Sequence, residues 1–231
     1  MKVFVIGDLH LSFSVDKPMD IFGGWKNHVD RLTYNWNNTV SKDDIVILAG
    51  DTSWGMSLSE SFEDFKFINN LPGTKYIIKG NHDYWWSTRS KIEAFFKEND
   101  INTLNILHNS SIETENFFIC GTRGWLFENS QPHDVKISSR EANRLETSLI
   151  SCKDSQKEKI VVLHYPPVFC DELMPEMIDV MKKYDVKRCF YGHLHGDSIK
   201  KATNCEYLGI KFQLISSDSL EFCPLEISKN K

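Results

Sequence analysis

The chain has 231 residues, of which 41% are hydrophobic, so it can bury a sizeable core within one domain spanning residues 1–231. Its formal net charge is −5, and without a basic tract it offers no extended patch for a long nucleic acid. No hydrophobic run approaches the roughly 18 residues that cross a membrane, and the cysteines include no CxxC pair. We therefore expect a soluble, cytoplasmic protein with reduced thiols and no membrane partner.

Five short hydrophobic runs each end in residues that can carry chemistry. Continuous β-branched runs of this kind predict strands that are buried on both faces. Ligands of open α/β sheets bind at the carboxyl ends of such strands, so we expect the side chains that follow them to meet there. The runs and residues are Lys2–Ile6 before Asp8 and His10, Ile45–Ala49 before Asp51, Tyr76–Ile78 before Asn81, His82 and Asp83, Ile160–Leu163 before His164, and Cys189–Tyr191 before His193 and His195.

Between these runs the hydrophobic residues follow helical spacing. Trp25, Val29, Leu32 and Trp36 share one face of a predicted helix over 25–36. Similar spacing indicates helices near residues 62–68, 92–96 and 142–149. Strands that alternate with helices predict βαβ units and a largely parallel sheet in the first half of the chain.

The later part of the chain is richer in strand patterns. Runs at 117–120, 207–215 and 220–227 have few helical patterns between them, which predicts a second, mixed or antiparallel sheet packed on the first. We find no internal repeat and no linker. The folded part is expected to span residues 1–227, with residues 228–231 as a disordered tail.

The residues at the strand ends are of the types that bind metals. Carboxylates and imidazoles are ligands for Mn, Fe and Zn. Most of these residues also follow a glycine, which lets the backbone turn sharply next to a ligand. Each short motif alone is common enough to arise by chance. The prediction of a metal site therefore rests on five motifs together, each after a hydrophobic run of strand length.

The full set of motifs resembles the calcineurin-like metallophosphoesterase superfamily. The resemblance covers nearly the whole chain and implies a four-layer α/β-β/α sandwich of two mixed β-sheets with flanking helices. It also implies a dinuclear metal centre at one edge, in agreement with the two-sheet pattern above. The residues that carry the resemblance are Asp8-x-His10, Gly50-Asp51, Gly80-Asn81-His82-Asp83, His164 and Gly192-His193-x-His195.

The resemblance implies a role for each of these residues. Asp8, His10 and His195 would bind one metal ion, and Asn81, His164 and His193 would bind a second. Asp51 would bridge the two ions, about 3.5–4 Å apart, which share a hydroxide that attacks phosphorus. Manganese, iron, zinc, cobalt and nickel are all candidates for these two divalent ions. His82 would act as the general acid, and we predict Asp83 beside it as a second catalytic residue that orients the loop.

One stretch departs from the protein Ser/Thr phosphatase branch of the superfamily. That branch carries GDxVDRG, whereas residues 50–55 here read GDTSWG. The second Asp and the Arg are absent, which makes a close relation to that branch unexpected. The residue that orients His82 and the cation that contacts phosphate are therefore left unassigned.

Other residues near the motifs are candidates for substrate contact. Trp54 and Trp85 offer aromatic faces for stacking, although packing within a loop is the favoured interpretation of each one singly. Arg89 and Arg123 have the forked guanidinium that suits phosphate, and a surface ion pair is the alternative. The loop around Asp16 and Asp20 follows the first motif and is placed to cap the site.

These residues predict a metal-dependent phosphoric ester hydrolase. The substrate would be a small phosphate ester or a nucleotide, and both a phosphomonoesterase and a phosphodiesterase remain open. A nuclease of the same fold is an alternative. It would need Lys and Arg along the path of the nucleic-acid strand, whereas the loops beside the motifs are rich in aromatic residues. An inactive metal-binding scaffold is a second alternative, but such a protein would lack ligands or His82, and all are present. The sequence does not indicate an oligomeric state.

Overall fold

The computed structural model of the chain describes residues 1–125, 132–170 and 172–228. Its strands form two larger sheets and a two-stranded ribbon. The first sheet has the order β13-β1-β2-β3-β4, in which β1 to β4 run parallel and β13 joins β1 in the antiparallel direction. Its strands are β1 (Val3–Ile6), β2 (Ile45–Leu48), β3 (Thr74–Ile77), β4 (Leu104–Ile106) and β13 (Leu225–Glu226).

The second sheet has the order β11-β12-β10-β7-β6-β5. Its four central strands run parallel, and the two edge strands β11 and β5 are antiparallel, so the sheet is mixed as predicted. Its strands are β5 (Ser110–Glu113), β6 (Phe117–Thr122), β7 (Glu158–Leu163), β10 (Arg188–Tyr191), β11 (Glu206–Tyr207) and β12 (Ile210–Leu214), and the separate ribbon pairs β8 (Val168–Phe169) with β9 (Glu172–Leu173).

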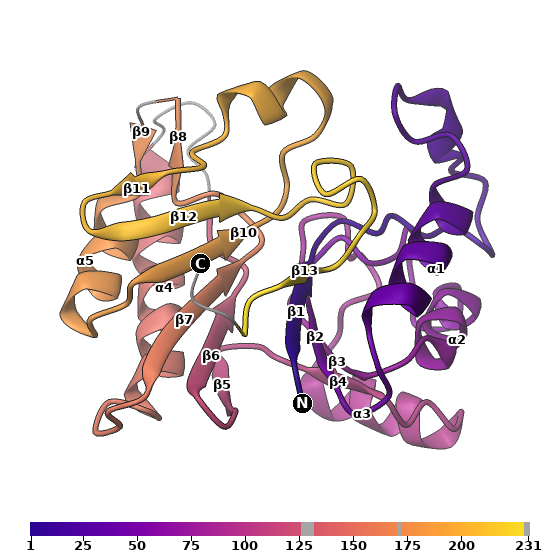
Figure 1. Ribbon diagram of the computed structural model, residues 1–231, viewed down its shortest axis with the longest axis horizontal. Coiled ribbons are helices and arrows are strands. Elements are labelled where there is room, and N and C mark those ends of the chain that lie inside the picture. The colour runs from indigo at the N-terminus through magenta and orange to yellow at the C-terminus, as the bar shows by residue number, and fades with distance from the viewer. Residues whose placement is uncertain (126–131, 171, 229–231) are drawn as a thin grey trace.

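Helices cover the outer face of each sheet, as Figure 1 shows. α1, α2 and α3 lie on the side of the first sheet, and α4 and α5 lie on the side of the second. The helical segments are η1 (Met19–Ile21), α1 (His28–Thr39), α2 (Phe62–Asn70), α3 (Arg89–Glu98), α4 (Pro132–Ile150), α5 (Pro175–Lys183) and η2 (Gly196–Lys201). In the described part of the chain, no helix has the length and apolar character needed to span a membrane.

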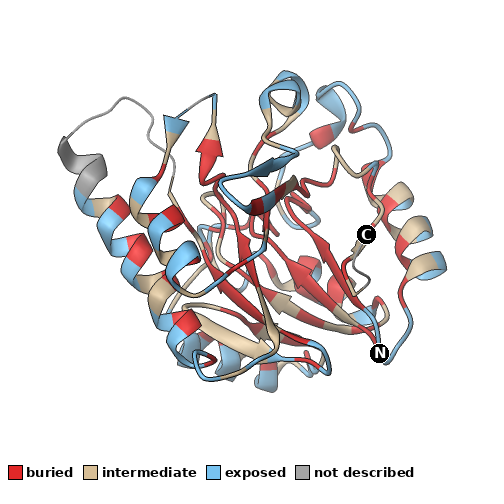
Figure 2. Cartoon of the chain, turned by 60° about the vertical axis from the view of Figure 1, so that its left-hand side comes forward, coloured by how far each residue is buried: buried red, intermediate tan, exposed pale blue. Residues whose placement is uncertain are grey.

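Three hydrophobic cores separate these layers. One core lies between the first sheet and its helices, and another lies between the second sheet and its helices. A third joins Val5 and Ile47 of the first sheet to Val162 and Phe190 of the second, so the two sheets pack face to face. Figure 2 shows the buried strands enclosed by helices with exposed outer faces. The four-layer sandwich is therefore confirmed.

Some predicted elements differ from the structure. The helix predicted over 25–36 begins at His28, because Asn27 adopts a left-handed conformation with φ of 52°. The run 207–215 is a hairpin of two strands that turns at Leu208 and Gly209, which both have positive φ. Only residues 225–226 of the run 220–227 form a strand. Helix α5 was not predicted; it begins at Pro175, and proline is favoured at the first position of a helix. Of the predicted tail, only Ser228 lies within the described residues.

Candidate metal centre

The loops after β1, β2, β3, β7 and β10 meet at the carboxyl ends of the parallel strands. Within the first sheet, the backbone N–H of Asp8 donates to the carbonyl of Gly50, and that of His10 donates to the carbonyl of Asp51, each at 2.9 Å. Across the two sheets, the backbone N–H of His193 donates to Asp8 Oδ1 at 3.0 Å. The structure thus brings the five sequence motifs into one site, as predicted from their places at strand ends.

Four of the residues in this site have left-handed backbone conformations. Asp8, His10, Asp51 and His193 have φ values of 59°, 47°, 49° and 74°. Such a conformation costs roughly 1–2 kcal/mol for a residue with a Cβ atom, and it persists only where the surrounding structure enforces it. Strain of this kind concentrates at functional sites. The backbone conformation therefore indicates a functional site in these loops, independently of their side chains.

Two glycines allow the loops to approach one another closely. A Cβ atom on Gly80 would collide with the side chain and the backbone nitrogen of Asp51. A Cβ atom on Gly192 would collide with the carboxylate of Asp8. Both glycines are therefore required by the narrow spacing between the strand ends, which is the role that the sequence suggested for them.

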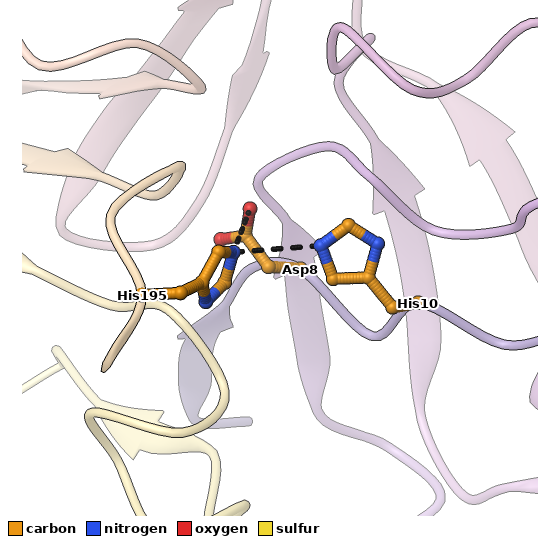
Figure 3. A group of neighbouring side chains, drawn as sticks. All are labelled: Asp8, His10 and His195. Atoms are coloured by element: carbon orange, nitrogen blue, oxygen red, sulfur yellow. Dashed lines mark hydrogen bonds and ion pairs between the residues drawn. The ribbon is translucent and has the colours of Figure 1, made fainter. Parts of the chain in front are cut away.

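Asp8, His10 and His195 form the first group of candidate ligands, shown in Figure 3. His195 Nε2 lies 3.3 Å from Asp8 Oδ1 and 3.4 Å from His10 Nε2. The other nitrogen of His195, Nδ1, donates to Asp218 Oδ1 at 2.8 Å. When Nδ1 carries the proton of the neutral ring, Nε2 presents a lone pair to the carboxylate and to the second imidazole.

The second group contains Asp51, Asn81, His164 and His193. His164 Nδ1 lies 2.9 Å from the carbonyl oxygen of Ala49, which can only accept, so this nitrogen carries the proton. The lone pair of His164 Nε2 therefore faces Asn81 Oδ1 at 2.6 Å, and Asp51 Oδ2 lies 3.6 Å from the same nitrogen. His193 Nδ1 also approaches Asn81 Oδ1, at 2.9 Å.

Lone pairs that face one another at these distances repel unless a proton or a metal cation lies between them. In each group one histidine, His195 or His164, donates to an oxygen from the ring nitrogen turned away from the site, which is the usual arrangement around a metal-bound histidine. Imidazole nitrogen with carboxylate and amide oxygen is a donor set that divalent transition metals accept. The residues present therefore fit divalent metal ions.

The electrostatics of the site are those of closely packed carboxylates and imidazoles. Burial raises the pKa of Asp51 well above its usual range, and the carboxylates of Asp83 and Asp8 raise it further. Burial also acts to raise the pKa of Asp8, but the neighbouring imidazoles, His195 foremost, lower it below its usual range. Burial lowers the pKa of His195, whereas Asp8 and Asp218 together raise it to about 10. Two buried carboxylates so close together are stabilised by positive charge beside them, which the His195 imidazolium or a metal ion can supply.

His82 lies beside the two groups and lines the same cavity. Its backbone N–H donates to Asp51 Oδ1 at 2.7 Å, and its ring centroid lies 5.9 Å from that of His10. Its Nδ1 is 3.3 Å from the hydroxyl of Tyr84, so the partner that the sequence left unassigned is a tyrosine. Burial lowers the pKa of His82.

Asp83, predicted as a catalytic residue, is buried with both carboxylate oxygens occupied. Its Oδ2 accepts from the backbone N–H groups of Asp51 at 3.0 Å and Gly80 at 2.7 Å. Its Oδ1 accepts from the backbone N–H of Thr52 at 2.8 Å and from the indole N–H of Trp85 at 2.9 Å. Asp83 therefore orients the two loops, as expected of it, and its position does not support direct contact with a substrate.

A cavity of about 350 Å³ opens over the candidate ligands. Trp54 borders it, with its ring stacked on His10 at 4.9 Å and tilted against His82 at 4.6 Å. The loop that was expected to cap the site contributes Met19, Phe22 and Gly23 to the other side of the cavity, whereas Asp16 and Asp20 do not line it. The lining consists of His10, Met19, Phe22, Gly23, Trp25, Asp51, Trp54, His82, His193, His195 and Gly196.

Two of the residues predicted to contact substrate lie elsewhere. Trp85 is only 2% exposed and packs edge-on against Phe65 at 4.8 Å, because its indole N–H is held by Asp83. Arg89 is exposed in the first turn of α3 and pairs with Glu93 at 2.7 Å, one helical turn away. The predicted substrate roles of Trp85 and Arg89 are therefore corrected to core packing and a surface ion pair.

Arg123 lies one layer of side chains away from the candidate ligands. Its guanidinium stands over the rings of Trp125 at 5.2 Å and Tyr165 at 5.8 Å. The ring of Tyr165 in turn lies 4.4 Å from that of His193. Arg123 does not line the cavity, and a role in phosphate binding stays a prediction.

Comparison with known proteins decides the family. A family model described as calcineurin-like phosphoesterase matches residues 1–197 of the chain. The chain belongs to the calcineurin-like phosphoesterase family. The matched region includes every predicted metal ligand from Asp8 to His195, and the resemblance inferred from the motifs is confirmed. Membership of the calcineurin-like phosphoesterases indicates hydrolysis of phosphoester bonds.

Solved structures share the calcineurin-like phosphoesterase fold at low sequence identity. A protein of unknown function, AQ665 from Aquifex aeolicus, is 16% identical with a TM-score of 0.52, covering 97% of this chain and 95% of its own. TT1561 of Thermus thermophilus is 11% identical with a TM-score of 0.55, covering 84% of this chain and 81% of its own. No curated protein matches the chain in sequence.

Two residues of this calcineurin-like phosphoesterase site, Asp218 and Tyr84, have roles that the sequence alone does not indicate. Asp218 holds His195 from the loop after β12, beyond the residues that the family model matches. It stands among serines and forms no recognisable motif, although it follows a buried strand as the other site residues do. Tyr84 follows the Gly80–Asp83 motif in the sequence, but only the fold shows that its hydroxyl faces His82.

Proposed function

We propose that the chain is a metal-dependent phosphoric ester hydrolase. One observation supports the proposal above all others. The ring nitrogens and the carboxylate and amide oxygens of both sheets converge beside an open cavity, at distances that need a proton or a metal ion between them. Family membership adds the reaction class, which is the cleavage of a phosphoester bond.

The two groups of ligands suit two divalent ions. Asp8, His10 and His195 would hold one, and Asn81, His164 and His193 would hold the other. Asp51 would bridge them, because its Oδ2 lies 3.8 Å from the Nε2 of His10 and 3.6 Å from that of His164. Bound ions would neutralise the phosphoryl oxygens and supply hydroxide as the nucleophile near neutral pH. Manganese, iron, zinc, cobalt and nickel all suit these ligands.

We assign His82 the role of general acid toward the leaving group. It lines the cavity without belonging to either ligand group, and its backbone is tied to the proposed bridging residue Asp51. The hydroxyl of Tyr84 contacts Nδ1 and orients the ring, and among the described residues no hydrogen bond occupies Nε2, which could carry a proton to the leaving alkoxide. Metal binding by Asn81 and proton donation by His82 would thus come from neighbouring residues of the loop after β3.

The six cysteines are free, which agrees with a protein that works in the reducing cytoplasm. The proposed substrate is a small phosphate ester or a nucleotide. Both the compartment and the substrate class are part of the proposal.

The proposal is tested by hydrolysis of p-nitrophenyl phosphate beside bis-p-nitrophenyl phosphate. The protein is first chelated, and Mn²⁺, Zn²⁺, Ni²⁺ or Mg²⁺ is then added back singly. We expect at least one metal to restore hydrolysis of at least one ester. Absence of turnover with every metal, in protein that binds the ions, would favour an inactive metal-binding scaffold.

A further inference from the structure

A second group of polar side chains lies close to the metal centre but outside the cavity that covers it. The register of β3 and β4 pairs Ile77 with Ile106, so Lys79 and His108 each stand two residues beyond the paired ends. Neither Lys79 nor His108 lines the cavity over the candidate ligands. The ends of β3 and β4 thus bring an amine and an imidazole together at a place that the proposed function does not use.

The second sheet and its helix α4 add two arginines to this place. Thr122 Oγ1, at the end of β6, donates to Asn109 Oδ1 at 3.0 Å, so the segment after β6 lies against the segment after β4. The same hydroxyl lies 3.3 Å from the carboxylate of Glu141, which pairs with Arg144 of α4. Arg123, which follows Thr122, and Arg144 therefore reach this place from two further elements of the fold.

The four groups are close enough to affect one another's protonation. Burial, and after it the charges of Arg144, Lys79 and Arg123, lower the pKa of His108 to about 4. Burial also lowers the pKa of Lys79, followed by the charge of Arg123, while the buried carboxylate of Asp83 acts in the opposite direction. The ring of His108 is therefore neutral near pH 7, and it stands among cations.

Several nitrogens of this group have no partner among the described residues. Arg123 Nε and His108 Nδ1 are buried without a hydrogen bond. The side chains of Lys79 and Arg123 form no ion pair and no hydrogen bond with a described residue, and the carboxylate of Glu141 is already bound to Arg144. Buried donors without acceptors and cations without counterions are both unfavourable, and an anion at this place would relieve both.

The guanidinium of Arg123 is positioned by its backbone and by two aromatic rings. Its backbone carbonyl accepts from the N–H groups of His164 at 3.1 Å and Tyr165 at 2.9 Å. Its guanidinium stands over the rings of Trp125 at 5.2 Å and Tyr165 at 5.8 Å. A guanidinium that stacks on rings with its face keeps the N–H groups in its plane for the oxygens of a phosphate.

We propose that Lys79, His108, Arg123 and Arg144 form a second binding site, separate from the metal centre, that takes a phosphate oxyanion. The anion accepts from Arg123 Nε and from His108 Nδ1, which then carries the proton of the neutral ring. It also offsets the charge of Lys79. The site needs no metal ion, so the inference does not rest on the proposed function.

Phosphate can reach this site from two sources. One is free phosphate, and the other is the second phosphate group of a ligand whose first group lies at the metal centre. The ring of Tyr165 lies 4.4 Å from that of His193 and carries the guanidinium of Arg123 on its other contacts, so the two sites are neighbours.

Titration calorimetry with inorganic phosphate tests the site in chelated protein, where no metal ion competes for the anion. We expect one phosphate to bind per chain. Lys79→Met and Arg123→Met should each weaken this binding by about tenfold or more, the value of one charge-assisted hydrogen bond. Arg140→Met is the matched control, because it removes one positive charge from an exposed position of α4, one helical turn before Arg144.

A second titration, into Mn²⁺-loaded protein, distinguishes the two sources. It compares pentane-1,5-bisphosphonate with pentylphosphonate, whose P–C bonds resist hydrolysis. A ligand that spans both sites predicts that the bisphosphonate binds at least about tenfold more tightly and that Lys79→Met removes this gain. Free phosphate as the occupant predicts no such gain.

Three results would overturn the inference. One is the absence of phosphate binding to the chelated protein. Another is full affinity in both Lys79→Met and Arg123→Met, which would place the anion elsewhere, such as among the histidines of the metal centre. An equal loss in Arg140→Met would show an effect of net charge alone. None of these results depends on turnover or on a bound metal, so a failure here is distinct from a failure of metal-restored hydrolysis.

Discussion

At the residue scale, neighbouring side chains in the site have separable roles. His82 touches Asp51 through its backbone and faces the cavity with its ring, but it belongs to neither ligand group. Removing its side chain should therefore affect proton transfer without affecting metal binding.

His82→Ala is predicted to keep its bound metal and to lose turnover by roughly 10²–10⁴-fold, the range for a general acid. The measurement pairs the metal content of the purified variant with kcat for the better of the two nitrophenyl esters. A variant that loses metal instead would show that His82 is a ligand, and the assigned role would be wrong.

Asp218 acts on the metal site through His195. Its carboxylate accepts from His195 Nδ1 and so directs the lone pair of Nε2 toward Asp8. We predict that Asp218→Asn lowers metal affinity by about 10–100-fold, as is usual for the partner of a metal-bound histidine.

Competition with a chromophoric chelator measures this affinity. Asp197→Asn is the matched control, because Asp197 is a neighbouring carboxylate with a 95% exposed side chain that pairs only with Lys200 among its described contacts. Equal metal affinity in both variants would mean that Asp218 has no part in holding the metal.

At the element scale, the strands were more predictable than the loops that connect them. The runs at 2–6, 45–49 and 160–163 are hydrophobic at nearly every position because both faces of these strands are buried, so their pattern is unambiguous. Residues 216–224, which carry Asp218, have no such pattern, since their place is fixed by contacts such as the hydrogen bond from Ser217 to the carbonyl of Gly7. Trp85 was misplaced for a related reason, because spacing along the chain does not say which way a loop side chain points.

Gly80 tests the close packing of the strand ends. A Cβ atom at this position would collide with Asp51, so Gly80→Ala should push the β3 loop away from the β2 loop. We predict a loss of about 1–3 kcal/mol in the free energy of unfolding, typical of overpacking, together with weaker metal binding.

Gly23→Ala provides the control for this change, because nothing lies within 4 Å of the position that its Cβ would take. Chemical denaturation of both variants gives the comparison, and the control should stay within about 0.5 kcal/mol of the parent protein. Equal stability and equal metal affinity in the two variants would mean that the β2 and β3 loops are not closely packed around Gly80.

At the scale of the whole molecule, the site depends on how the two sheets are packed. Asp8, Asp51 and Asn81 follow strands of the first sheet, whereas His164 and His193 follow strands of the second. The pattern of hydrophobic runs indicated that there are two sheets, and the family resemblance supplied their arrangement. The inter-sheet core could not be deduced from spacing alone, because it joins residues as distant in sequence as Val5 and Phe190.

Metal ions that bridge the sheets should stabilise the folded state. At a metal concentration 100 times the dissociation constant, binding adds about 2.7 kcal/mol to the free energy of unfolding. For a chain of this size that corresponds to a rise in Tm of roughly 5–11 °C. Thermal denaturation of chelated protein, with and without added Mn²⁺, measures the shift, and an unchanged Tm would contradict binding between the sheets.

The most direct test of the metal-dependent hydrolase is a titration of metal into chelated protein, with ions bound per chain and ester hydrolysis recorded together for the parent and Asp51→Asn. We expect hydrolysis in the parent to rise to its maximum as two ions bind. We expect Asp51→Asn, which lacks the charge of the proposed bridging carboxylate, to bind metal more weakly and to lose most of its activity. Full hydrolysis in the chelated parent, or in Asp51→Asn, would contradict the proposed mechanism.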